Sequence, residues 1–89
     1  MAKSFSQKKK EVLGHVDFIS NTLHKAGASV AVLDAYRKSL KDLKKESELS
    51  GWFRGYTKRV GEVITHYPKS APLINDQRKS IERIIGSQL

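Results

Sequence analysis

Apolar side chains recur along this chain at spacings of three and four residues, and this periodicity constrains the fold more than any other feature. Such spacing puts one apolar stripe along the side of a helix. It appears in four consecutive segments, at about residues 6–25, 29–48, 50–67 and 73–87. Ala26-Gly27 supplies a helix stop after the first segment, and Pro68 and Pro72 bracket the link before the fourth. The alternation typical of strands is not sustained anywhere, so the sequence predicts an all-α chain.

The four stripes are buried most simply when the four helices pack against one another. Short links between successive segments favour antiparallel neighbours, so the sequence predicts an antiparallel four-helix bundle. A single domain spanning residues 1–89 is expected, because 89 residues is about the size of one small domain. The expected core consists of Val16, Ile19, Leu33, Tyr36, Leu40, Leu43, Phe53, Val60, Ile64, Ile81 and Ile84.

Several positions carry more local expectations. Ser4 and Gln7 have the spacing of an N-terminal capping box. The second stripe also includes Val32, and the fourth extends to Gln88. Phe18 lies across its helix from the first stripe, so we expect it at the surface.

The third segment is expected to be the weakest helix. It contains Gly51, Gly55 and Gly61, and each glycine costs roughly 1 kcal/mol relative to alanine inside a helix. Trp52 lies about 80° from the centre of the third stripe, so its indole is expected to flank the core and to be partly exposed. A tryptophan in that position either covers the edge of the core or anchors a partner, and both interpretations stay open here.

The sequence lacks the residue patterns of enzymes and metal sites. It has no cysteine, which excludes disulfides and cysteine-ligated zinc. His15, His24 and His66 do not have the spacing of three or four residues that puts two ligands on one helix face. Neither a nucleophile motif nor a phosphate-binding glycine loop is present. We therefore expect no catalytic residue, metal, cofactor or small-molecule substrate, and we do not expect an enzyme.

The charge balance favours an anionic partner. The chain has 17 Lys and Arg against 9 Asp and Glu, a formal net charge of +8. Nucleic acid, anionic lipid and an acidic protein surface all fit this charge, which also promotes solubility alone. Arg54, Lys58 and Arg59 lie among the aromatic residues of the third segment, a pattern found in nucleic-acid-binding proteins. The apolar runs are too short for a membrane-spanning helix.

Three stretches follow one another in a characteristic order: Val32-Leu-Asp-Ala-Tyr36 running into Leu40-Lys-Asp-Leu-Lys-Lys45, the polar break Glu46-Ser-Glu48, and Asn75-Asp-Gln-Arg-Lys79 after an apolar third helix. This order, from about Leu33 to Ile84, resembles the immunity proteins of pediocin-like (class IIa) bacteriocins. Those are small, basic, cysteine-free proteins of lactic acid bacteria and their relatives. The second helix of that family has a similar Tyr/Leu stripe and Leu-Lys-x-Leu-Lys pattern.

The resemblance implies a cytoplasmic protein that protects the producer cell from a pediocin-like bacteriocin. It implies binding to the membrane component of the mannose phosphotransferase permease once the bacteriocin has engaged it. Peripheral contact with the anionic inner face of the membrane is compatible with the charge, at about 1 kcal/mol per basic residue near the surface. The alternative is a small basic helical protein that binds nucleic acid.

Exposure and charge, independently of the resemblance, indicate which residues contact a partner. The expected partner-binding surface joins the basic part of the third segment to the C-terminal half of the fourth. It consists of Trp52, Arg54, Lys58, Arg59, Arg78 and Arg83.

Overall fold

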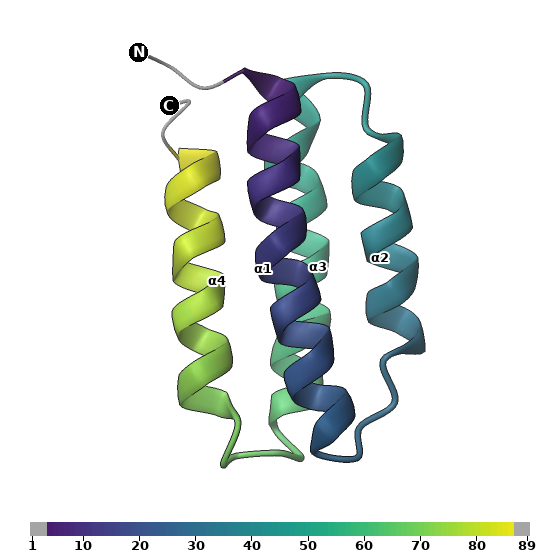
Figure 1. Cartoon of the computed structure of the whole chain (residues 1–89), viewed down its shortest axis with the longest axis vertical. Helices are drawn as coiled ribbons and strands as arrows, with labels where there is room; N and C mark the ends of the chain where they lie inside the picture. The colour runs from purple at the N-terminus through teal and green to yellow at the C-terminus, as the bar shows by residue number, and fades with distance from the viewer. Residues whose placement is uncertain (1–3, 87–89) are drawn as a thin grey trace.

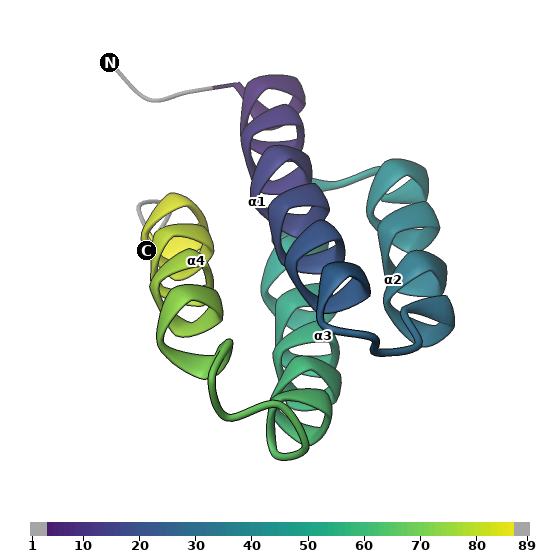
Figure 2. The ribbon, with the colours of Figure 1, turned by 60° about the horizontal axis from the view of Figure 1, so that its bottom comes forward.

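A computed structural model of the protein, which describes residues 4–86, contains four helices packed as an antiparallel bundle (Figure 1). The helices are α1 (Phe5–Lys25), α2 (Ala31–Asp42), α3 (Leu49–Ile64) and α4 (Ala71–Gly86), with a short 3₁₀ turn, η1 (Glu46–Glu48), before α3. Both α1 and α3 pack against α2 on one side and α4 on the other (Figure 1, Figure 2). No strand occurs within residues 4–86, and the predicted all-α bundle is confirmed.

Both ends of α1 follow signals in the sequence. At the N-terminus, the Ser4 hydroxyl oxygen accepts a hydrogen bond from the Gln7 N–H at 3.1 Å, which is the first of the two bonds of the predicted capping box. At the C-terminus, Gly27 has a φ of 97° and its N–H donates to the His24 carbonyl at 3.0 Å. A residue with positive φ ends a helix while satisfying its last carbonyls, and glycine adopts that conformation without strain.

The second helix is shorter than the predicted span of 29–48. It ends at Asp42, because Leu43 is extended with φ −60° and ψ 136°. Lys9 of α1 donates from Nζ to the carbonyls of Lys41 and Leu43, at 2.8 and 2.9 Å. A cation at a helix C-terminus is favourable because the last carbonyls are unpaired and carry partial negative charge. Lys9, which is distant in the sequence, therefore caps α2 at a point where the apolar pattern of the sequence still predicts helix.

Carboxylates hold the segment between α2 and α3. Oε1 of Glu48 accepts hydrogen bonds from the N–H groups of Lys44 and Lys45, both at 2.9 Å. Oε2 of Glu46 lies 3.3 Å from Nζ of Lys8, whose side chain is only 3% exposed. These bonds replace those of a continued helix, so the segment predicted as helical up to residue 48 is instead a short link, extended at Leu43 and Lys45, followed by η1.

The third helix is continuous through its three glycines, and it ends at Ile64, before the predicted residue 67. Close packing against Tyr36 explains why residue 55 is a glycine. A Cβ at this position would lie 3.0 Å from Oη and 3.1 Å from Cε1 of Tyr36. Glycine thus lets the Tyr36 ring pack directly against the backbone of α3.

The fourth helix begins at Ala71, slightly before the predicted residue 73. Pro72 falls in its first turn, where a helix does not need the backbone N–H that proline lacks. The predicted end at residue 87 and the position of Gln88 lie outside the described residues.

The core lies where the four helices meet. Six of the predicted core residues are buried: Val16, Ile19, Leu33, Leu40, Val60 and Ile81. The other predicted core residues are half-buried and pack against these: Tyr36, Leu43, Phe53, Ile64 and Ile84. Val32 was predicted in the second stripe but is 53% exposed, because it lies about 100° around the helix from the buried Leu33.

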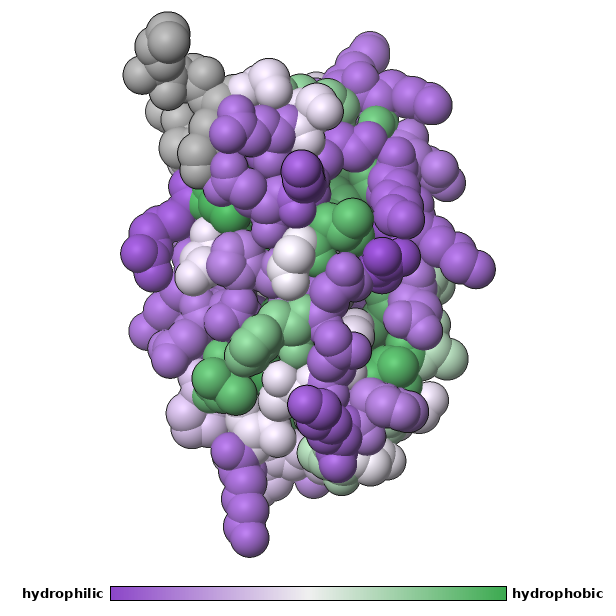
Figure 3. Space-filling model, viewed as in Figure 1, coloured by the Kyte–Doolittle hydropathy of each residue, from purple (hydrophilic) through white to green (hydrophobic). Residues whose placement is uncertain are grey.

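The surface is mainly hydrophilic. On the face viewed in Figure 1, polar and charged side chains predominate and hydrophobic ones form small patches (Figure 3). Phe18, Val32 and Leu73 are the large hydrophobic residues with substantial exposure in the described part of the chain, and the prediction for Phe18 is confirmed. Within residues 4–86, no helix has both the length and the apolar character needed to cross a lipid bilayer.

Candidate partner-binding surface

A groove runs between α3 and α4 on the side away from the core. It consists of adjoining hollows of about 330 and 260 Å³ that share Phe53, Thr57 and Glu82. We call it the α3–α4 groove and define it by all the residues lining the two hollows. These are Ser50, Phe53, Arg54, Thr57, Asn75, Arg78, Lys79, Glu82, Ile85 and Gly86.

Arg78 ties the two walls of the groove together. Its Nε donates to the Thr57 hydroxyl at 2.7 Å, and its Nη2 donates to the Thr57 carbonyl at 3.1 Å. Its Nη1 donates to Oδ1 of Asn75 on its own helix at 2.8 Å. Two guanidinium nitrogens therefore hold α4 against α3, and the third fixes the side chain on its own helix. Because all three are bonded within the protein, Arg78 supports the groove and is not a free charge.

The other cations of the groove are available to a partner. Arg54 is exposed, and so is Arg83, which lines an adjoining hollow together with Lys79, Glu82 and Gly86. Neither arginine belongs to an ion pair found within residues 4–86. Lys79 is also exposed, whereas Glu82 is the acidic residue of the lining. Phe53 and Ile85 supply an apolar floor beneath these charges. A half-apolar groove with a basic rim fits a partner that is both apolar and anionic.

Of the six residues of the predicted surface, only Arg54 and Arg78 line this groove. Arg83 lines the adjoining hollow, and the other three lie elsewhere. Lys58 is exposed but does not line either hollow. Nη1 of Arg59 lies 3.0 Å from Oε1 of Glu62. The hydrogen bond to Glu62, with a further contribution from Tyr36 of α2, raises the pKa of Arg59 above its ordinary value. Arg59 thus belongs to the α2 side of α3.

The predicted exposure of Trp52 is wrong. Its side chain is 7% exposed, its Nε1 donates to the Tyr36 carbonyl at 2.8 Å, and its ring stacks on Tyr56 with centroids 4.9 Å apart. Burial raises the pKa of Tyr56 above its ordinary value, so the phenol stays neutral. Leu49, Trp52, Tyr56 and Val60 form the buried stripe of α3, which is rotated toward α2 from the predicted stripe through Phe53.

Several residues of the groove were not predicted from the sequence, although their spacing along each helix places them on one face. Both walls have positions at i, i+3, i+4 and i+7, namely 50, 53, 54 and 57 on α3 and 75, 78, 79 and 82 on α4. Such positions share one helix face. Sequence alone does not reveal that these two faces meet, because this depends on how α3 and α4 are rotated in the bundle.

The histidines do not form a cluster. Nδ1 of His15 lies 2.6 Å from Oε1 of Gln77, which joins α1 to α4, whereas His24 and His66 are exposed. Among the residues that the structure describes, no three His, Asp or Glu side chains are close enough together to hold a metal ion.

No protein-family model, curated protein or solved structure shows significant similarity to this chain.

Proposed function

We propose that this protein is an immunity protein that protects its cell from a pediocin-like bacteriocin, with the α3–α4 groove as its partner-binding surface. The observation that carries the proposal is the groove itself, whose lining combines the basic Arg54 and Lys79 with the apolar Phe53 and Ile85. Arg83 adds a further cation in the adjoining hollow. The resemblance in sequence order from Leu33 to Ile84 supports the same function. The partner would be the membrane component of the mannose phosphotransferase permease with bacteriocin bound.

The chemistry of the groove suits a site beside a membrane. The cytoplasmic protein would approach an anionic leaflet, where each basic residue near the surface contributes about 1 kcal/mol. Apolar side chains of the partner would fill the space over Phe53 and Ile85, since buried apolar and aromatic anchors supply most of the energy of a protein interface. The exposed arginines would fix the orientation and speed the encounter.

The proposal is tested by expressing the chain in a strain sensitive to pediocin-like bacteriocins. Wild-type protein should raise tolerance to one or a few of these peptides. A double variant, Arg54→Glu with Arg83→Glu, should lose that protection while remaining folded. Lys10→Glu with Lys41→Glu is the matched control, because it changes the charge equally at exposed positions of α1 and α2. Unchanged killing by peptides of every subgroup would overturn the proposal.

A nucleic-acid-binding function is the alternative that the charge leaves open. Stacking on bases needs accessible aromatic rings, yet Trp52 and Tyr56 are buried. The α3–α4 groove therefore favours a protein or membrane partner. Binding of single-stranded or duplex nucleic acid, with an affinity that falls steeply with salt, would instead support the alternative.

A further inference from the structure

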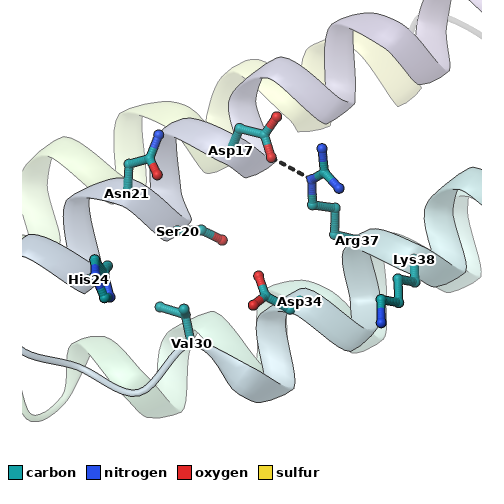
Figure 4. A pocket seen from close by; sticks show the side chains of 8 residues that line it. All are labelled: Asp17, Ser20, Asn21, His24, Val30, Asp34, Arg37 and Lys38. Atoms are coloured by element: carbon teal, nitrogen blue, oxygen red, sulfur yellow. Dashed lines mark hydrogen bonds and ion pairs between the residues drawn. The ribbon is translucent and has the colours of Figure 1, made fainter.

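A second hollow, of about 440 Å³, lies between α1 and α2 (Figure 4). We call it the α1–α2 cleft and define it by the eight residues that line it, which are Asp17, Ser20, Asn21, His24, Val30, Asp34, Arg37 and Lys38. The α1 members again recur at spacings of three and four residues, so one polar face of α1 looks across at a polar face of α2. This cleft shares no residue with the α3–α4 groove.

Ser20 is the unusual member of the cleft. The residue is 9% exposed, and its hydroxyl oxygen has no hydrogen-bond partner in the described part of the chain. Hydroxyls in helices can bond to the carbonyl four residues earlier, as Ser80 does in α4 and Thr65 does at the C-cap of α3. The hydroxyl of Ser20 points instead toward the space between Asp17 and Asp34 (Figure 4). A buried polar group without a partner calls for an explanation, such as a ligand that completes it.

The groups around this hydroxyl are mainly hydrogen-bond acceptors. Oδ1 of Asp17 lies 2.6 Å from Nε of Arg37, and this pair joins α1 to α2. The second oxygen of Asp17 and both oxygens of Asp34 take part in no hydrogen bond within the described range. The Asp34 carboxylate extends from α2 toward Ser20 (Figure 4). Asn21 adds a side-chain amide at the same wall.

The cations of the cleft do not reverse this balance. Arg37 is already bonded to Asp17, and its charge is also attracted by Asp34, although the two side chains form no hydrogen bond. The Lys38 side chain does not point toward Ser20, and His24 lies at the far end of the cleft (Figure 4). The net charge of the whole protein acts weakly here, because exposed charges more than about 10 Å apart are largely screened at 0.1 M salt. The nearest charges therefore decide which ligand is attracted.

We propose that the α1–α2 cleft binds a primary ammonium group, with Asp34 as its counter-charge and the hydroxyl of Ser20 as an acceptor. An ammonium has three N–H donors and no acceptor, which matches the two carboxylates and the hydroxyl that converge here. Asp17, held by Arg37, supplies the third acceptor. The ammonium belongs either to a free small amine or to a lysine side chain of a peptide. This site is additional to the partner-binding surface proposed above, and its test does not involve bacteriocins.

The test is a titration of the ¹⁵N-labelled protein followed by amide chemical shifts. The probes are n-butylammonium and a short peptide with one lysine and blocked ends. Saturable shifts should be confined to residues 17–24 and 30–38. Tetramethylammonium, which has the charge but no N–H donor, and the same peptide with norleucine in place of lysine should give no saturable shifts. If the peptide binds at least tenfold more tightly than n-butylammonium, the ligand is a lysine side chain. If the two affinities are equal, the ligand is a free amine.

Variants then locate the bound group. Asp34→Asn should weaken binding by at least about tenfold, and Ser20→Ala by about threefold. Asp76→Asn on α4 is the matched control, since it makes the same charge change far from the cleft, and it should leave the affinity unchanged. The proposal is overturned if neither probe gives saturable shifts, if tetramethylammonium binds as well, or if Asp34→Asn has no greater effect than Asp76→Asn. Unfolding curves of the two cleft variants show whether a loss of binding merely follows a loss of folded protein.

Discussion

Trp52 and Phe53 are adjacent in the sequence but lie in different surroundings. Trp52 is enclosed between α2 and Tyr56, whereas Phe53 is half-buried on the floor of the α3–α4 groove. A rotation of α3 by less than one residue position decides which of the two is the core residue. The apolar pattern alone does not determine this rotation, because both aromatic residues fit an apolar stripe.

At Trp52, we expect substitution to affect stability. Trp52→Phe should lower the free energy of unfolding by about 1–2 kcal/mol, because it removes the hydrogen bond to the Tyr36 carbonyl and part of a buried ring. Urea denaturation followed by circular dichroism measures the change. Phe18→Ala is the control at an exposed aromatic position, and it should change stability by less than about 0.5 kcal/mol. Equal effects of the two substitutions would mean that Trp52 is not a core residue.

Two glycines of α3 should respond oppositely to alanine. At Gly51 a Cβ has nothing within 4 Å, so Gly51→Ala should stabilise the protein by about 0.5–1 kcal/mol through helix propensity. At Gly55 the Cβ would lie within 3.1 Å of two atoms of the Tyr36 ring, so overpacking should outweigh that gain. We expect Gly55→Ala to destabilise the protein by on the order of 1 kcal/mol. If both variants are stabilised in thermal and urea unfolding, α2 and α3 are not in close contact at Tyr36.

At the scale of elements, some helix ends are determined by residues close in the sequence and others by residues far away. Ser4 and Gly27 bound α1 through contacts with residues at most four positions away, and the sequence predicted both. The end of α2 depends on Lys9, more than thirty positions earlier, and on the turn held by Glu48. Leu43, Lys44 and Lys45 continue the apolar and charged pattern of a helix, so local signals placed the end of α2 too late.

The turn after α2 should make stability depend on pH. Hydrogen bonds from the backbone N–H groups of Lys45 and Lys44 lower the pKa of Glu48 below its ordinary value. Folding therefore favours the ionised carboxylate, and the resulting stability is present above about pH 4.5, the usual range for an unfolded glutamate, and is lost as the pH falls through the lowered value. Wild type should be more stable than Glu48→Gln at pH 7, and the difference should shrink toward pH 3. Urea denaturation across this range tests it, and a difference that stays constant or widens in acid would contradict the role of Glu48.

At the scale of the whole molecule, a chain of 89 residues has one thin core, so each buried aliphatic residue matters. Leu40 on α2 and Ile81 on α4 are 1% and 0% exposed, and they lie on helices on opposite sides of the bundle. Replacing either with alanine should lower the free energy of unfolding by about 2–5 kcal/mol. Val32→Ala is the control on the exposed side of α2 and should change it by less than about 0.5 kcal/mol. Circular dichroism during urea unfolding gives all three values, and a loss under 1 kcal/mol at Leu40 or Ile81 would contradict the core described here.

The sequence by itself determined the number of helices, their order and part of the core, because a helix with one apolar stripe has to bury it and neighbouring stripes joined by short links do so side by side. It also determined the two ends of α1 and the basic character of α3 and α4. Only the tertiary structure decided the rotation of α3 that buries Trp52, the end of α2 beneath Lys9, and the pairing of Arg78 with Thr57. It also decided which polar faces meet at the α3–α4 groove and at the α1–α2 cleft. These features depend on contacts between residues distant in the sequence, and their energies are comparable to those of the local preferences they override.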